Sequence, residues 1–126
     1  MNIFFLDADP RAAARMQCDK HIVKMPLETA QLLCTAVNYM GGTTPYKSTH
    51  VNHPMSVWIR ESANNFIWLH SHGISLCVEY TRRYNREHKS QEVIRNLFDQ
   101  RGLFPAAKTT TIPNCCVPED CRLDNI

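Results

Sequence analysis

Apolar residues recur at helical spacing along most of the chain. The most regular run keeps three-and-four spacing over about five turns and comprises Phe66, Leu69, Gly73, Leu76, Cys77, Tyr80 and Tyr84. This pattern predicts a long helix that ends between Arg86 and Lys89. His70 and His72 lie two positions apart on it, so their side chains point to different sides. We expect one of them to line the core and the other to be exposed.

A second helix is predicted to begin near Asp19 and to end near Met40, just before a pair of glycines. Pro26 lies inside this segment, and a proline within a helix removes one backbone hydrogen bond and clashes with the preceding turn. Two arrangements fit this pattern. Either one helix is kinked at Pro26, or a short turn over residues 19–24 precedes a helix with Pro26 at its first position.

Capping residues predict where the shorter helices begin. Asp9 followed by Pro10 is a favourable helix start, and Pro54 opens another helix after a polar loop over residues 41–53. That helix either continues past Glu61 or gives way to a new helix capped by Ser62.

The two ends of the chain have different patterns. Met1–Asp7 is apolar and predicts a short strand or an extended arm, whereas Ser90 is predicted to cap a last helix that ends at Gly102. From residue 103 onward there is no periodicity, which predicts an irregular tail that packs on the surface or orders with a partner. The predicted fold is all-α. It is a single compact domain over residues 1–126, with four to five helices in a core over 1–102 and the tail over 103–126.

Composition narrows the functional classes only slightly. The 126 residues fit one domain, and a hydrophobic fraction of 44% is ordinary for a globular protein. The formal net charge of +2, from 14 basic and 12 acidic residues, is too small to indicate nucleic acid by itself. No apolar stretch approaches the ~20 residues of a membrane span, and the first residues lack the basic region of a signal peptide. We expect no membrane partner and a cytoplasmic location.

The chain has six cysteines, which a cytosolic location predicts to be reduced. Cys34 and Cys77 lie on apolar helix stripes and are expected in the core. Cys115, Cys116 and Cys121 could bind a metal only with a fourth ligand, and they lack the C-x2-C spacing of common zinc modules. We therefore expect no cofactor.

The first group of candidate functional residues lies on the second predicted helix. At about 100° per residue, one sector of roughly 80° contains His21, Lys24, Glu28 and Gln31. A solvated charged face and a polar working surface both explain this pattern. A lysine beside another cation can act as a nucleophilic amine, and a glutamate within reach can transfer protons. Lys20, His21 and Glu28 are the catalytic candidates, with Lys24 and Gln31 as substrate contacts, for imine chemistry on an aldehydic sugar.

The second group lies in the polar loop and in the helix after it. Its candidate substrate contacts are His50, Asn52, His53, Trp58, Arg60 and Glu61. Three interpretations remain open. The two histidines could ligate zinc with a third ligand such as His21 or Cys18, or the side chains could anchor the loop. Alternatively, imidazole and guanidinium groups beside a tryptophan could contact phosphate and stack on a base.

The third group follows the sequence E-Y-T-R-R-Y at residues 79–84 and continues with basic residues up to Lys89. Tyr80 could stack on a base, and Arg83 could neutralise a phosphate. Alternatively, the cations complement the helix dipole, and Glu79 and Arg83 form an ordinary ion pair four residues apart.

Together these groups resemble a family of small, mostly phage-encoded proteins. The matching stretches are C-D-K-H-I-V-K-M-P-L-E-T-A-Q-L-L at 18–33, H-V-N-H-P at 50–54, W-I-R-E-S at 58–62 and E-Y-T-R-R-Y with H-K at 79–89. The resemblance extends over residues 1–107. The chain is also distantly similar to small all-α pyrimidine-dimer DNA glycosylases of the endonuclease V type, in which a basic helix is followed by an H-P-x-x-x-W segment.

The glycosylase resemblance implies roles for several residues. Glu28 would be the acid/base group, and phosphate or base contacts would come from Lys20, His21, Lys24 and Arg60. The attacking amine of that class is an N-terminal α-amino group. Asn2 is bulky enough that Met1 is expected to be retained, so the amine would be that of Met1 or of Lys20.

Two functions from different classes follow. The first is a nucleic-acid- or nucleotide-directed phage protein in the host bacterial cytoplasm, most concretely a glycosylase/lyase-like hydrolase of DNA repair. The alternative is a non-catalytic phage protein that uses the same residues to sequester a host protein or a signalling nucleotide. A structural zinc module is a third option. The sequence carries no signal for oligomeric state.

Overall fold

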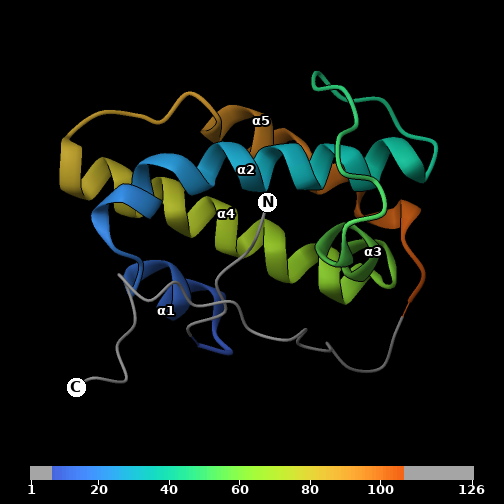
Figure 1. Ribbon diagram of the computed structural model, residues 1–126, viewed down its shortest axis with the longest axis horizontal. Helices are drawn as coiled ribbons and strands as arrows, with labels where there is room; N and C mark the ends of the chain where they lie inside the picture. The colour runs from blue at the N-terminus through green and yellow to red at the C-terminus, as the bar shows by residue number, and fades with distance from the viewer. Residues whose placement is uncertain (1–6, 107–126) are drawn as a thin grey trace.

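The computed structural model of the chain describes residues 7–106. Within that range it has no strand and consists of α1 (Pro10–Arg15), α2 (Asp19–Tyr39), α3 (Pro54–Arg60), α4 (Ala63–Tyr84), α5 (Gln91–Asn96) and a 3-10 helix η1 (Phe98–Leu103), as shown in Figure 1. The predicted all-α fold class is confirmed. The predicted N-terminal arm and most of the C-terminal tail lie outside the described residues.

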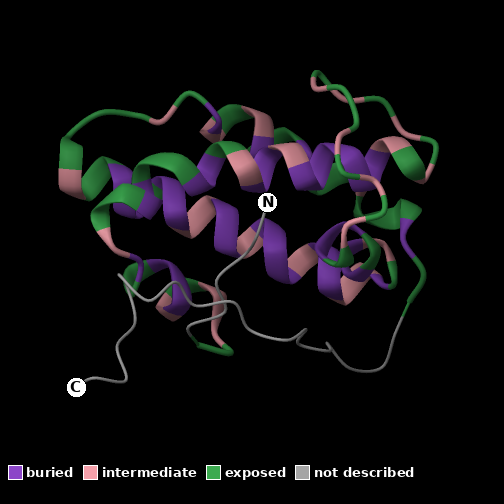
Figure 2. Ribbon diagram, viewed as in Figure 1, coloured by how far each residue is buried: buried purple, intermediate pink, exposed green. Residues whose placement is uncertain are grey.

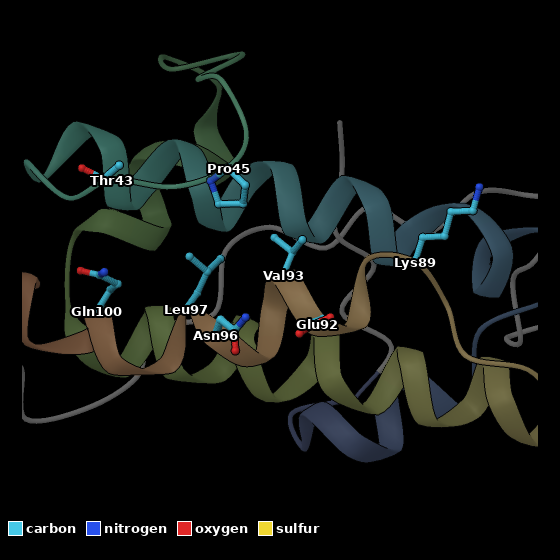
Figure 3. Close-up of a pocket in the computed structure, with 8 residues that line it drawn as sticks. All are labelled: Thr43, Pro45, Lys89, Glu92, Val93, Asn96, Leu97 and Gln100. Atoms are coloured by element: carbon cyan, nitrogen blue, oxygen red, sulfur yellow. The ribbon is translucent and has the colours of Figure 1, made fainter.

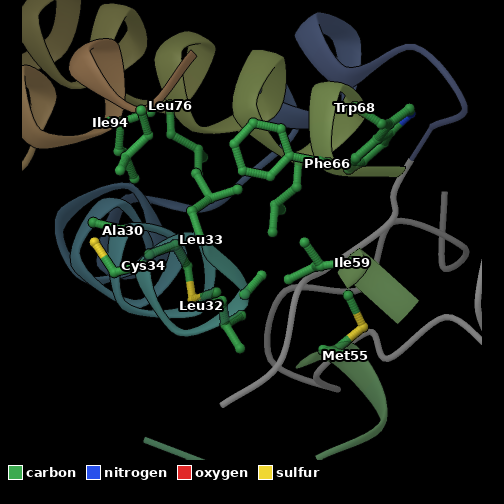
Figure 4. Close-up of a cluster of buried hydrophobic side chains, with 14 of the residues drawn as sticks. Ala30, Leu32, Leu33, Cys34, Met55, Ile59, Phe66, Trp68, Leu76 and Ile94 are labelled. Carbon is green, nitrogen blue, oxygen red and sulfur yellow. The ribbon is translucent and has the colours of Figure 1, made fainter. Parts of the chain in front are cut away.

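Helices α2 and α4 run antiparallel at the centre, and α4 contacts every other helix (Figure 1). Their buried residues gather on the sides that face each other (Figure 2). The core between them and the shorter helices includes Ile22, Leu33, Ile59, Phe66, Leu69, Leu76 and Ile94, several of which are drawn in Figure 4. Removing this apolar surface from water is the main force that holds α2 in place.

Gly73 allows α4 to approach α2 closely. A Cβ atom at this position would lie 2.8 Å from Thr29 Cγ2 on α2 and 3.2 Å from Ile94 Cδ1 on α5. Because both distances are shorter than ordinary van der Waals contacts, a side chain here would push the helices apart. The glycine in the apolar stripe of α4 therefore has a packing role.

The helix starts follow from local capping chemistry. Asp9 Oδ1 accepts a hydrogen bond from the Arg11 N–H at 2.9 Å, and Ser62 Oγ accepts one from the Asn65 N–H at 3.1 Å. The Ser62 cap decides between the two predicted alternatives, because a new helix begins after it. His53 caps α3 by accepting a hydrogen bond at Nδ1 from the Met55 N–H at 3.1 Å, so Pro54 opens this helix as predicted.

Helix α2 is continuous from Asp19 to Tyr39 with Pro26 inside it. This excludes the alternative in which a helix starts at Pro26. Met25 and Pro26 are both buried, so the proline that interrupts the backbone hydrogen bonding also contributes apolar surface to the core.

Two predicted helix ends differ from the structure. Helix α4 stops at Tyr84, before the predicted end between Arg86 and Lys89, because Asn85 adopts a left-handed conformation with φ 56°. Asparagine tolerates this region better than most residues. The last predicted helix is divided: α5 ends at Asn96, and the chain tightens into the 3-10 helix η1. Ser90 occupies the cap position of α5 but makes no side-chain capping hydrogen bond.

His70 and His72 are both buried, so the prediction that one of them is exposed is wrong. His70 Nε2–H donates to the Ile94 carbonyl at 2.8 Å, and His72 Nδ1–H donates to the Pro10 carbonyl at 3.0 Å. The two side chains do point to different sides of α4. Both sides are covered, because α5 packs on one and α1 on the other.

The first residues after position 102 belong to the packed part of the chain. Phe104 is buried and stacks on Phe66 with ring centroids 4.5 Å apart. The Pro105 carbonyl accepts a hydrogen bond from the Ala63 N–H at 2.7 Å. The irregular tail predicted to begin at residue 103 is therefore anchored at its start.

The cysteines of the described residues fall into two groups. Cys34 and Cys77 are free and buried, as predicted, and burial raises the pKa of the Cys77 thiol to about 12. Cys18 takes part in a disulfide, which departs from the expectation of reduced thiols. Cys115, Cys116 and Cys121, for which no metal site is expected, lie outside the described residues. Among the described helices, none is both long and apolar enough to cross a membrane.

Candidate functional site

The polar face of α2 carries the central candidates. Lys20 and Lys24 are exposed, Glu28 and Gln31 are partly buried, and His21 is buried. The Glu28 side chain is 17% exposed, and its Oε2 atom lies 3.9 Å from Lys24 Nζ. The structure therefore places an amine next to a carboxylate that is mostly removed from water.

The amine at Glu28 belongs to Lys24 rather than to Lys20. Eight residues separate Lys20 from Glu28, which at about 1.5 Å per residue places them about 12 Å apart along the helix axis. Lys24 is one turn away and forms the i,i+4 pair. The two lysines of this face therefore reach different parts of it.

His21 lies in the first turn of α2 with its ring removed from water. Burial lowers the pKa of His21, and the neighbouring charges of Lys20 and Lys24 lower it further. Its Nδ1 atom lies 3.5 Å from Cys18 Sγ. A histidine with a lowered pKa is neutral at pH 7, so it offers a hydrogen bond and not a positive charge to a substrate.

The loop histidines have local structural roles. His50 adopts a positive φ of 53° and its Nδ1 atom lies 2.8 Å from Thr49 Oγ1. His53 is the cap of α3, and burial lowers its pKa. Asn52 is exposed. This loop runs over the C-terminal half of α2, where Thr35 Oγ1 accepts a hydrogen bond from the Thr49 N–H at 3.0 Å.

Arg60 fastens this loop to the end of α2. Its Nη1 atom donates to the Val51 carbonyl at 2.6 Å, and its guanidinium lies 3.9 Å from the ring centre of Tyr39. Trp58, on the same helix, is buried and meets Trp68 edge to face at 6.2 Å. Glu61 is exposed.

Arg83 and Tyr80 lie near the opposite end of α2. Arg83 donates to Glu79 Oε1 at 2.8 Å and to Asp19 Oδ1 at 2.9 Å. Tyr80 is buried, and its hydroxyl accepts a hydrogen bond from Arg86 Nε at 3.0 Å.

The three predicted groups are spread along α2. Arg83 contacts Asp19, the first residue of the helix, and Arg60 contacts Tyr39, its last residue. These two positions are about 30 Å apart along the axis. Glu28 and Gln31 lie between them, and Lys24 and Glu28 are the predicted site residues that pair directly.

Sequence reasoning missed two features that shape this surface. Thr35 and Asn38 hold the loop, and Asn38 Nδ2 donates to the Tyr46 carbonyl at 3.0 Å. These residues continue the polar face of α2 beyond Gln31 at helical spacing, which is the signal that could have revealed them. The second feature is the burial of Glu79, which is 3% exposed and binds Arg82 in addition to Arg83, the partner that i,i+4 spacing suggested.

Two shallow pockets lie on the side of α2 next to α5. One has a volume of about 480 Å³ and is lined by Leu27, Tyr46, Tyr80, Arg86, Glu87, His88, Lys89 and Ser90. The other, about 330 Å³, lies between the start of the loop and α5 (Figure 3) and is lined by Thr43, Pro45, Lys89, Glu92, Val93, Asn96, Leu97 and Gln100. Tyr80 is the predicted site residue at the first pocket, and none lines the second.

Metal binding was one interpretation of the loop histidines. Within residues 7–106, no three His, Cys, Asp or Glu side chains are grouped in a way that could hold a metal ion. The zinc interpretation of His50 and His53 therefore finds no third ligand in this range.

The geometry of the α2 face is that of a carboxylate with a nearby amine, flanked by basic groups. A family model described as pyrimidine dimer DNA glycosylase matches residues 1–92. The chain belongs to this family. The matched range contains α1 to α4 and every predicted site residue. The match confirms the resemblance and supports a DNA-directed function in coarse terms. No curated protein and no solved structure matches the chain.

Proposed function

We propose that this pyrimidine dimer DNA glycosylase family member is a DNA repair enzyme that excises a damaged pyrimidine and then cleaves the abasic strand. The observation that carries the proposal is the family match over residues 1–92. The second support is Glu28 itself, a carboxylate whose side chain is only 17% exposed on the polar face of α2 and which can serve as a proton-transfer group. A solvated structural face does not need such a carboxylate.

The proposed reaction uses an amine and Glu28 in successive steps. The amine nitrogen attacks C1′ of the damaged nucleotide, and the C1′–N bond breaks as the base leaves with the electron pair and takes up a proton. The nitrogen loses a proton and its lone pair forms the imine at C1′, while the C1′–O4′ bond breaks and O4′ takes up a proton as the sugar opens. Removal of a C2′ proton then expels the 3′ phosphate oxygen by β-elimination. Glu28 is the group that delivers the proton to O4′ as the sugar opens and removes the proton from C2′.

The attacking amine is the α-amino group of Met1 or the side chain of Lys20. Met1 lies outside the described residues, and Lys20 is about 12 Å from Glu28 along α2. Lys24 holds the ion pair with Glu28 and supplies positive charge for the phosphates around the damaged site. His21, Gln31, Arg60 and Glu61 are the further contacts proposed for the bases or the backbone.

The decisive experiment uses a duplex oligonucleotide with one cyclobutane thymine dimer and, in parallel, one with an abasic site. The wild-type protein is expected to incise the damaged strand of both duplexes, and borohydride is expected to trap it on abasic DNA as a reduced covalent adduct. Glu28→Gln is expected to lose incision by about 10²-fold or more while it retains DNA affinity. Glu92→Gln, an exposed site on α5, is the matched control with wild-type activity.

The non-catalytic alternative predicts a different result. A protein that only binds DNA, a nucleotide or a host protein would show neither incision nor a trapped adduct, and Glu28→Gln would then change affinity alone. No adduct and no incision with the wild-type protein would refute the proposed enzyme. A phage origin and a host cytoplasmic location remain part of the proposal and are consistent with a DNA substrate.

A further inference from the structure

The guanidinium of Arg83 is hydrogen-bonded to four groups of the protein itself, which leaves little of it available to bind a phosphate. Its guanidinium donates to Glu79 Oε1 at 2.8 Å, Asp19 Oδ1 at 2.9 Å, the Gln17 carbonyl at 3.0 Å and the Arg15 carbonyl at 3.2 Å. A guanidinium has five N–H donors, and these contacts occupy four of them. The Arg83 side chain is 19% exposed, so little of it is open to a substrate.

These contacts join two parts of the chain that are distant in sequence. Glu79 and Arg83 lie on α4, the central helix, whereas the other three partners belong to the corner between α1 and α2. Glu79 is 3% exposed, and a buried carboxylate requires ionic partners. Arg82 and Arg83 both bind Glu79, so the guanidinium of Arg83 is held in place on α4 while it reaches the corner between α1 and α2.

The corner held in this way directly precedes the catalytic candidates. Asp19 is the first residue of α2, and Lys20 and His21 follow it. The His21 and Ile22 N–H groups both donate to the Cys18 carbonyl at 3.0 Å. A displacement of the corner would therefore move the first turn of α2 and the side chains on it.

We propose that Arg83, held by Glu79, is a positioning residue that fixes the first turn of α2, and that it does not contact the substrate phosphates. The inference rests on the proposed function, because it concerns the positions of Lys20 and His21 relative to Glu28 during base excision. It reassigns Arg83, one residue of the basic motif near the end of α4, from nucleic-acid binding to fixing the position of the first turn of α2.

Arg83→Lys separates the two roles. A lysine keeps the positive charge and would still neutralise a phosphate, but its single ammonium group cannot reach all four acceptors. The positioning role predicts that kcat for incision of dimer DNA falls at least about tenfold. KM and the dependence of binding on salt concentration stay at wild-type values.

The alternatives give different results in the same assays. A direct phosphate contact predicts that Arg83→Ala raises KM and lowers the slope of log affinity against log salt by about one, while Arg83→Lys stays near wild type. A purely structural role predicts that Arg83→Lys loses stability without loss of kcat. Ile94→Val, a core change on α5 away from this corner, is the control for lost stability with unchanged kcat.

Asp19→Asn is a milder second variant, because Asp19 is 78% exposed and its loss removes one contact of Arg83. It is expected to lower kcat about threefold in the same direction as Arg83→Lys. Wild-type kcat in both variants would overturn the inference.

Hydrogen exchange measures positioning without any activity. In Arg83→Lys the amides of His21 and Ile22 are expected to exchange at least about tenfold faster than in the wild type, relative to core amides of α4. Unchanged exchange at these amides overturns the inference. A wild-type protein that fails to incise DNA, combined with faster exchange in the variant, refutes the proposed function and leaves the positioning of α2 established.

Discussion

The corner around α1 and the loop over residues 41–53 are both held against the long helices by side chains that bind backbone carbonyls, but the side chains differ. The corner is bound by ionisable groups: His72 donates to the Pro10 carbonyl at 3.0 Å, and Arg83 donates to the Gln17 carbonyl at 3.0 Å. The loop is bound mainly by neutral side chains of α2, with Asn38 Nδ2 donating to the Tyr46 carbonyl at 3.0 Å.

This difference has consequences for stability and dynamics. Buried ionisable groups respond to pH and cost much energy when their partners are removed. A neutral hydrogen bond is worth about 1 kcal/mol, and a loop that is held by such bonds can open locally. The corner next to Lys20 and His21 is therefore expected to be firmly held but sensitive to acid, whereas the loop is held more weakly at all pH values.

The largest expected effect is a loss of corner attachment in acid. Burial lowers the pKa of His72 to about 4 from the ordinary value of 6.5. Because the folded state disfavours the proton, this contribution to stability is fully present above pH 6.5 and is lost as the pH falls towards 4. The difference of pKa corresponds to about 3 kcal/mol of unfolding free energy. Urea unfolding at a series of pH values measures it.

Two variants sharpen this pH prediction. His72→Gln removes the titrating group, so its unfolding free energy is expected to change less between pH 6.5 and pH 4 than that of the wild type. His50→Asn is the control, because asparagine accepts the positive φ at this loop position, and it should retain the wild-type pH dependence. An equally steep profile in His72→Gln would contradict the assignment to His72.

An intermediate effect is expected from the loop anchor. Thr35 is fully buried, and its hydroxyl accepts a hydrogen bond from the Thr49 N–H. Thr35→Val conserves the shape but leaves this N–H without its acceptor, which should lower the unfolding free energy by about 2 kcal/mol. The Thr49 amide should also exchange faster with solvent. Ser48→Ala, at an exposed position of the same loop, should change stability by less than about 0.5 kcal/mol.

The smallest effect is expected where the loop meets the end of α2. The guanidinium of Arg60 lies over the ring of Tyr39, which is 58% exposed. A double-mutant cycle with Tyr39→Leu and Arg60→Lys should give a coupling energy of about 0.5 kcal/mol. A coupling energy of about 3 kcal/mol, the size expected for the buried histidine of the corner, would show that the loop is held as firmly as the corner.

Local sequence signals were sufficient for much of the fold. Asp9, Pro54 and Ser62 mark helix starts because a cap satisfies backbone N–H groups of its own first turn. The sequence predicted the apolar stripe of α4 because the three-and-four spacing of its residues arises within a single helix. The basic helix α2 and the H-P-x-x-x-W segment that follows it at the start of α3 indicated a distant similarity to pyrimidine dimer DNA glycosylases, and the match over residues 1–92 then showed the family.

The site residues were less readable, because a charged residue looks the same in sequence whether it meets a substrate or another helix. Arg83 was predicted as a substrate contact, and the structure ties it to the backbone carbonyls of Gln17 and Arg15. The pairing of Lys24 with Glu28 follows from i,i+4 spacing and was visible beforehand.

The sequence by itself indicated where most of the helices lie, several of their starting caps and the family, since each depends on residues that are near in the chain or on a recognisable motif. Only the tertiary structure decided that both histidines of α4 are buried, that α2 runs unbroken through Pro26, and that Arg83 binds residues 64 to 68 positions away. The physical reason is that burial and long-range hydrogen bonds depend on which helices pack together. Helical periodicity indicates which side of a helix is apolar. Other helices pack on more sides of α4 than its apolar pattern indicates.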